Sequence, residues 1–157
     1  MKLSTKVDIE APIDEVFGAL TDFEGFERAA LRRGADVVRM GQPRPNGVDQ
    51  VWRVAFDYRG KRRQLTVRLV ALDQPNALRF QGTAKSLDGQ LLVDLVALSR
   101  RQTRVTVTLD ITPKTLTARI FVQSLLFARG RINDRFAKRI GAFAKTIEDR
   151  LRKPSMG

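Results

Sequence analysis

The sequence predicts an α+β fold in which one antiparallel sheet is covered by a long C-terminal helix. Three observations lead to this prediction. Residues 3–9 alternate between apolar and polar side chains, as in a half-buried strand. Residues 35–112 repeat strand patterns between turn signals, and residues 113–152 carry apolar side chains at helical spacing. Because a sheet with one apolar face must bury that face, the long helix is expected to cover it.

A short helix is expected after the first strand, which ends at the Ala11-Pro12 pair. Pro12 suits the first turn of a helix, where its missing N–H has no intrahelical partner to lose. Asp14 and Glu15 follow at positions where the helix dipole favours negative charge. The spacing of the next apolar side chains is helical: Ile13, Val16, Phe17 and Leu20.

A second short helix is expected from the Thr21-Asp22 pair to Gly34, with Asp22 placed to act as its N-cap. Phe17, Phe23 and Phe26 fall within these two helices. We expect the three rings to plug one end of the sheet; the alternative is that Phe23 or Phe26 borders a cavity entrance.

Six strands are expected between residues 35 and 112, which gives about seven with the first. No repeat and no linker interrupts them, so residues 1–157 are expected to form a single domain. The turn signals are GQPRPNG at 41–47, RG at 59–60, DQPN at 73–76, SLDG at 86–89 and SRRQ at 99–102.

One hairpin can be placed in register from the sequence. The Arg59-Gly60 pair makes a two-residue loop, so Tyr58 should face Lys61 and Phe56 should face Arg63. One face of this hairpin is then apolar and the other solvated, with an ion pair expected between Asp57 and Arg62 on the solvated side. The expected apolar face holds Trp52, Val54, Phe56, Tyr58, Leu65, Val67 and Leu69.

The long C-terminal helix has an apolar stripe and basic remaining sides. The stripe consists of Ile132, Phe136, Ile140, Phe143, Ile147 and Leu151. Before it, residues 120–128 are apolar nearly all round, and Gly130 is expected to break or kink the chain between this segment and the main helix. Segment 120–128 is too short to span a bilayer. Burial on the sheet is the favoured interpretation; a cavity gate, or contact with a second subunit or an anionic membrane, are the alternatives.

Composition limits the chemistry. The chain has no Cys and no His, so it lacks disulfides, thiolate metal sites and the usual metal ligand and general base. The net charge of +12 attracts phosphates, anionic lipid or acidic partners, although solubility is the simplest explanation. Nucleic acid is not favoured, because the basic residues are not interleaved with exposed aromatics. With neither a signal-peptide pattern nor a long apolar run, we expect a soluble cytoplasmic protein.

The stretch VDIEAPIDEVFGALTDFEGFE, residues 7–27, resembles the opening of START-like proteins of the SRPBCC superfamily, which includes polyketide cyclase-like and lipid-transfer domains. The strand, the Ala11-Pro12 break, the Asp14 to Phe17 helix, and Asp22 with Phe23 carry the resemblance. It extends over the whole chain, since the strand count and terminal helix also fit. It implies a helix-grip fold, with a curved sheet around the C-terminal helix and an apolar cavity between them.

The candidate ligand-pocket residues come from the apolar face of the sheet, the terminal helix and the polar groups beside them. No cofactor and no metal is expected. The pocket residues are Trp52, Phe56, Tyr58, Arg63, Phe80, Asp94, Phe136, Ile140 and Phe143.

Asp94 is the least certain of these by sequence, because both faces of its strand are mostly apolar. A loop at residues 99–102 pairs Asp94 with Val107 and turns it inward, where it would act as a ligand or catalytic group. A slip of one residue turns it to solvent. We favour the outward or paired orientation, because an inward carboxylate needs a cation or a proton.

Binding or carriage of a small hydrophobic ligand, anionic or lipid-like, is the expected function. The first alternative is an enzyme of the cyclase, dehydratase or aromatase kind using the same cavity, although no catalytic set is recognisable. The second is an interaction module that works through the basic surface, and a homodimer is a further expectation. Two or more converging inward polar side chains would favour the enzyme; a uniformly apolar lining would favour carriage.

Overall fold

The computed structural model describes residues 1–42 and 47–153. Its order of elements is the expected one, and the α+β prediction of seven antiparallel strands and a long C-terminal helix is confirmed. The elements are β1 (Lys2–Ile9), α1 (Ile13–Leu20), α2 (Phe23–Arg32), β2 (Asp36–Met40), β3 (Val51–Tyr58), β4 (Lys61–Asp73), β5 (Ala77–Thr83), β6 (Leu87–Ser99), β7 (Gln102–Pro113), α3 (Leu116–Leu126) and α4 (Arg129–Arg152).

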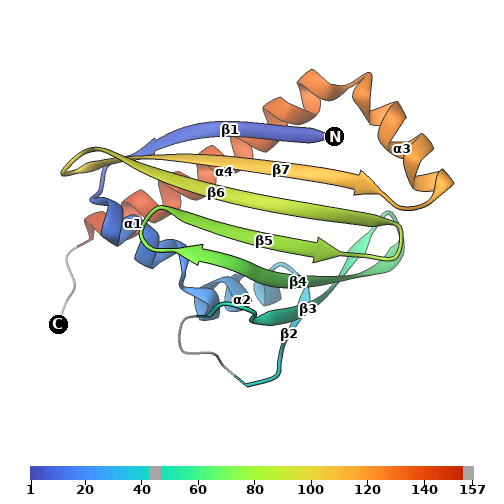
Figure 1. Ribbon diagram of the computed structural model, residues 1–157, viewed down its shortest axis with the longest axis horizontal. Helices are drawn as coiled ribbons and strands as arrows, with labels where there is room; N and C mark the ends of the chain where they lie inside the picture. Colours follow the sequence, from blue (N-terminus) through green and yellow to red (C-terminus); the bar gives the residue numbers. More distant parts are fainter. Residues whose placement is uncertain (43–46, 154–157) are drawn as a thin grey trace.

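All strand pairs are antiparallel, in the spatial order β1-β7-β6-β5-β4-β3-β2. Figure 1 shows the curved sheet in front and α4 running behind it, from α3 at one end to α1 at the other. We call the face toward α4 the inner face and the opposite one the outer face. The two ends of the sheet are the α1 end and the α3 end.

The tightly packed core lies at the α1 end. Ala144 and Ile147 of α4 are buried there against the inner face and the helix α1. Inward-pointing side chains of the sheet and buried residues of α1 complete this core: Ile9, Val16, Phe17, Trp52, Leu69, Leu78, Val93, Leu95, Val105 and Val107. Phe17 therefore fills this end, as predicted.

The register predicted for the β3–β4 hairpin is confirmed. Tyr58 pairs with Lys61 and Phe56 with Arg63 around the Arg59-Gly60 loop. Both loop residues have positive φ, which is why the two-residue turn matches the twist of its strands. On the outer face, Arg62 forms the expected ion pair with Asp57 at 3.3 Å.

Helix α2 is fixed at its start by Asp22. Its carboxylate accepts the backbone N–H of Gly25 at 3.1 Å and a hydrogen bond from Nη2 of Arg150 at 3.0 Å. These hydrogen bonds, that from Gly25 above all, lower the pKa of Asp22 below its usual value. The predicted N-cap is confirmed, and it also ties α2 to the last turn of α4.

Helix α4 runs along the edge strand β1 and takes up hydrogen bonds that the strand would otherwise leave open. The backbone N–H of Ser4 donates to Oδ1 of Asn133 at 3.3 Å. Just beyond the strand, the N–H of Glu10 donates to Oε2 of Glu148 at 2.8 Å. Side chains of a helix thus take the place of a neighbouring strand.

Two local predictions need correction. The sequence placed a turn at residues 86–89, but β6 begins at Leu87, and the hydrogen bond from the N–H of Ala84 to the carbonyl of Leu87 closes the turn earlier. Most of segment 120–128 is not buried on the sheet, because residues 120–126 belong to the separate helix α3, in which only Ala118 and Val122 are buried. The break between α3 and α4 falls at Phe127 and Ala128, and Gly130 lies inside α4. The turn predicted at 41–47 lies mainly outside the described residues.

Candidate functional site

Two glycines lie side by side on the inner face near the α3 end. Gly82 of β5 pairs with Gly89 of β6, which in turn pairs with Ile111 of β7. A Cβ added to Gly89 would meet nothing closer than the carbonyl oxygen of Asp110 at 3.8 Å, so the space above Gly89 is open, whereas a Cβ added to Gly82 would meet Cδ1 of Leu65 at 3.3 Å. Glycine in a strand interior weakens the strand and often marks a close approach by another molecule.

Large apolar side chains surround the two glycines and are only half-buried. We call this area the inner apolar surface: Phe56, Leu65, Val67, Phe80, Gly82, Gly89, Leu91 and Ile111 of the sheet, faced by Phe136 and Ile140 of α4. The same face is fully buried at the α1 end. The packing of the sheet against α4 is therefore dense at one end and incomplete at the other.

The predicted pocket residues of β3 and β4 divide into core and rim. Trp52 is only 6% exposed and packs against Phe23 and Phe80, with ring centroids 5.2 and 6.5 Å away. It belongs to the core more than to an open wall. Tyr58 and Arg63 share its face but lie near the hairpin tip, where both are exposed.

The predicted residues of α4 also divide. Phe136 and Ile140 pack against the core and stay half-buried, as expected for a wall facing the sheet. Phe143 is 39% exposed, and its ring lies 5.5 Å from that of Phe26 in α2. Phe143 therefore joins α2 to α4 beside the inner apolar surface.

The inward orientation of Asp94 is wrong. The register of β6 with β7 shifts between Ala97 and Ser99, so Asp94 pairs with Thr106. Val93 and its partner Val107 are both buried on the inner face, which puts Asp94 on the outer face. The favoured outward orientation holds, and Asp94 is removed from the pocket.

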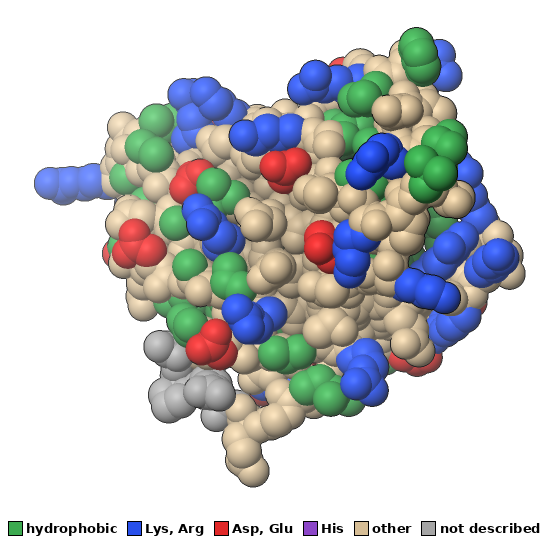
Figure 2. Space-filling model, turned by 45° about the vertical axis from the view of Figure 1, so that its right-hand side comes forward, with side chains coloured by type: hydrophobic (Ala, Val, Ile, Leu, Met, Phe, Trp, Pro, Cys, Tyr) green, Lys and Arg blue, Asp and Glu red, His purple; other side chains and the backbone are tan. Residues whose placement is uncertain are grey.

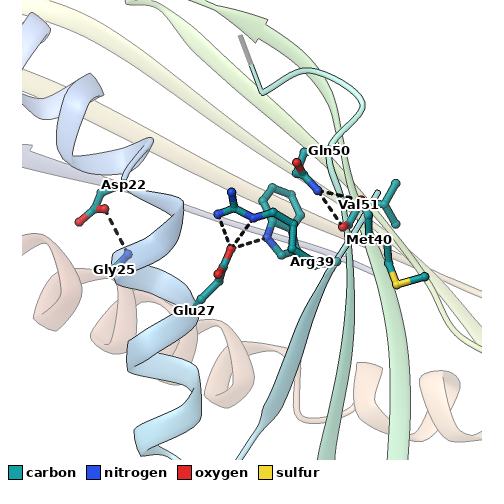
Figure 3. A network of polar contacts seen from close by, with 8 residues as sticks. Asp22, Gly25, Glu27, Arg39, Met40, Gln50 and Val51 are labelled. Carbon is teal, nitrogen blue, oxygen red and sulfur yellow. Dashed lines mark hydrogen bonds and ion pairs between the residues drawn. The ribbon is translucent and has the colours of Figure 1, made fainter. Parts of the chain in front are cut away.

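Glu27 is a polar contact that the sequence analysis missed. Its Oε1 accepts hydrogen bonds from Nε1 of Trp52 at 3.0 Å and from Nε and Nη2 of Arg39 at 2.9 and 2.5 Å, as Figure 3 shows. Glu27 lies one helical turn after Phe23, so both reach the sheet from the same side of α2. Arg39 balances the charge of the Glu27 carboxylate, and the same carboxylate accepts the indole N–H of Trp52. Glu27 therefore holds the indole in place.

The rim at the α3 end is basic. The guanidinium of Arg59 lies 5.4 Å from the ring centroids of both Tyr58 and Phe121, which brings the hairpin tip against α3. Lys61 and Arg63 point from β4 toward the same face as the inner apolar surface. A cationic edge thus borders an apolar floor.

Two hollows lie on the outer face. One of about 320 Å³ is lined by Met40, Gly41, Gln42, Asp49, Val51, Arg53 and Thr66. Another of about 220 Å³ is lined by Gln81, Asp88, Gly89, Gln90, Asp110 and Thr112. The inner apolar surface lies on the opposite face of the sheet, beneath α4.

In the part of the chain that the structure describes, no three acidic side chains lie close enough together to hold a metal ion. Within residues 1–42 and 47–153, no helix is long and apolar enough to cross a membrane. The arrangement offers an apolar surface, a basic rim and an anchored tryptophan.

The family model described as polyketide cyclase / dehydrase and lipid transport matches residues 1–148. The chain belongs to this family. The START-like resemblance of residues 7–27 is thereby confirmed. A search of curated proteins by sequence finds no match.

Solved structures show the same fold at low sequence identity. The Zhui aromatase/cyclase from Streptomyces sp. R1128 is 19% identical, with a TM-score of 0.68 over 97% of this chain and 96% of that one. A START superfamily protein from Mycobacterium smegmatis is 14% identical, with a TM-score of 0.66 over 93% and 98%. Norcoclaurine synthase from Thalictrum flavum is 10% identical, with a TM-score of 0.69 over 98% and 87%.

Membership of the polyketide cyclase / dehydrase and lipid transport family sets the class of function. The chain is a hydrophobic ligand-binding or cyclase-like protein of the START-like type. The neighbours share its fold, and their identities are too low to carry over any residue's role.

Proposed function

We propose that this protein binds and carries a small hydrophobic ligand on the inner apolar surface beneath α4. The observation that carries the proposal is the paired glycines Gly82 and Gly89 within a half-buried apolar area, on a face that is otherwise tightly packed. Burying an apolar ligand there removes both its surface and the protein's from water. Each 100 Å² of apolar surface buried contributes roughly 2.5 kcal/mol before the cost of association.

The basic rim favours a ligand with one anionic end. Lys61 and Arg63 leave the same face as the apolar floor, and Arg59 lies beside them at the hairpin tip. A carboxylate or phosphate held there would leave the apolar part of the ligand over the glycines. The favoured ligand is therefore an amphiphile with one acidic group.

The positions of the polar groups favour carriage over an enzyme of the cyclase, dehydratase or aromatase kind. In the described residues, Glu27 is held by Trp52 and Arg39, Asp94 lies on the outer face, and Tyr58 is at the exposed rim. These groups do not converge on the inner apolar surface. A general acid or base must lie within hydrogen-bond reach of the substrate proton that it transfers.

The test uses anilinonaphthalene sulfonate, a fluorescent probe with apolar rings and one anionic group. We expect saturable binding to the native protein, and loss of at least tenfold in affinity in Gly89→Leu, whose side chain would occupy the open space. Gln90→Leu is the matched control, because it adds the same side chain one residue away on the outer face. Equal affinity in both variants would overturn the proposal, and native mass spectrometry of the freshly purified protein would then be expected to show no apolar adduct.

A further inference from the structure

Helix α3 carries an apolar stripe on the side turned away from the protein. Leu116 is 72% exposed, Ile120 is 59% exposed and Phe127 is 95% exposed. Ile120 lies four residues after Leu116, and Phe127 lies eleven residues after it. These distances are about one and three helical turns, so the three side chains share one side of the helix. Phe127 keeps helical dihedral angles at the end of α3 and continues the stripe.

The opposite side of α3 is already used for packing. Ala118 and Val122 are buried there and hold the helix to the body of the protein. The stripe is therefore not a displaced part of the core. A monomeric protein rarely leaves several large apolar side chains together in water, and such a patch marks an interaction site.

The segment that carries the stripe has charge of one sign, although its first basic residue, Lys114, is ion-paired with Asp88 of β6 at 3.3 Å. Residues 114–131 contain four basic residues and no Asp or Glu. Figure 2 shows blue Lys and Arg side chains beside green hydrophobic ones at the end of the molecule where α3 lies. The four basic residues are Lys114, Arg119, Arg129 and Arg131.

We propose that α3 docks onto an anionic lipid surface, with the stripe of Leu116, Ile120 and Phe127 inserted at the level of the acyl chains. Arg119, Arg129 and Arg131 would contact the headgroup phosphates. Apolar side chains flanked by Lys and Arg are the composition of helices that lie in the membrane interface. This docking is independent of the proposed ligand, because none of its residues belongs to the inner apolar surface.

A second copy of the chain fits this surface less well. Two copies meeting through the stripe would bring the same arginines together, and like charges facing each other oppose association. An anionic membrane offers acyl chains to the apolar stripe and phosphates to the basic groups. The hairpin tip adds Arg59, which packs over Phe121 of α3 at 5.4 Å, to the same end of the molecule.

Vesicle flotation of the full chain tests the proposal. Vesicles of equimolar phosphatidylcholine and phosphatidylglycerol should bind the protein at low salt and release most of it at high salt. Vesicles of phosphatidylcholine alone should bind much less. Equal binding to both compositions would overturn the anionic part of the proposal, and no binding to either would overturn the whole.

Two variants with matched controls locate the contact. The double variant Ile120→Ser with Phe127→Ser keeps the charge and should lower partitioning by about tenfold or more, because it removes two large apolar groups. Val96→Ser is its control, since Val96 is 58% exposed on the outer face near the α1 end. Arg119→Gln with Arg131→Gln should also lower partitioning, and Arg100→Gln with Arg101→Gln, in the β6–β7 turn, should have a smaller effect.

The oligomeric state decides between the membrane and a second copy. Analytical ultracentrifugation should give a monomer whose mass is unchanged in the Ile120→Ser, Phe127→Ser variant. A native dimer that this variant dissociates would overturn the proposal in favour of self-association. Because all the substituted side chains are exposed, circular dichroism should show an intact fold in every variant.

Discussion

The indole N–H of Trp52 donates a hydrogen bond to Oε1 of Glu27 over 3.0 Å, and the same oxygen accepts two hydrogen bonds from Arg39. Helix α2 is thus held to strands β2 and β3 by one carboxylate oxygen. Trp52 is the only tryptophan of the chain, so all tryptophan fluorescence of the protein comes from this side chain.

Replacing Glu27 by Ala should destabilise the protein by about 1–3 kcal/mol, because it leaves the buried indole N–H without an acceptor and Arg39 without its partner. Urea unfolding followed by Trp52 fluorescence measures the loss. Glu24→Ala, also on α2 but exposed, should change the free energy of unfolding far less. A Glu27 variant as stable as the native protein would show that the contact adds nothing to folding.

Replacing Arg63 by Gln should weaken binding of anilinonaphthalene sulfonate by roughly two- to fivefold, the range expected for an exposed charge pair. Arg63 points from β4 toward the inner face. Arg68→Gln on the outer face of the same strand removes the same charge and should leave the affinity unchanged. Fluorescence titration at low salt compares the two, and equal losses would mean that only net charge matters.

Asp94→Asn should leave probe binding unchanged, because Asp94 pairs with Thr106 on the outer face. Titration of this variant beside the native protein gives the measurement. A clear change in affinity would contradict the orientation that the register shift assigns to this carboxylate.

The stabilising effect of Asp22 should depend on pH. Its pKa in the folded protein lies below the usual 3.8, chiefly because the N–H of Gly25 and then Arg150 hydrogen-bond to the carboxylate. A lowered folded-state pKa means that the stabilisation is complete above the unfolded value and is lost as the pH falls through the folded one. Asp22→Ala should therefore cost about 1 kcal/mol at neutral pH and progressively less in acid.

Urea unfolding at a series of pH values measures this difference. The gap between native protein and Asp22→Ala should narrow below the usual carboxyl pKa of 3.8. A gap that stays constant down to strong acid would show that the cap acts without its charge.

The sequence was sufficient where local rules decide the structure. The Arg59-Gly60 pair permits a two-residue loop, and one loop length sets every pair of the β3–β4 hairpin. The helix starts at Pro12 and Asp22 also depend only on neighbouring residues, because caps and the helix dipole act within the first turn. The order of the remaining elements followed from the strand and helix patterns, and the family resemblance of residues 7–27 added the helix-grip arrangement.

The errors occurred where one residue changes the face of a strand. The irregularity between Ala97 and Ser99 shifts the register so that Asp94 points outward. No residue type in this part of the sequence predicts the shift. Gly89 was assigned to a turn because SLDG is a common turn pattern, although it lies within β6. The site therefore lost a predicted carboxylate and gained a glycine.

Individual side-chain contacts between distant parts of the chain could not be predicted. Glu27 and Trp52 are far apart in the chain, and nothing in their local sequences marks them as partners. The exposure of Phe127 depends on the angle between α3 and α4, which apolar composition does not specify. A segment that is apolar all round looks the same whether it is buried or exposed.

The contacts of Ser4 with Asn133 and of Glu10 with Glu148 have a consequence for the behaviour of the protein at high concentration. An open sheet edge invites strands of other molecules to add to it, which is a route to fibres. At β1 an incoming strand would first have to displace the side chains of α4. The terminal helix thus protects the sheet from growing into an aggregate along this edge.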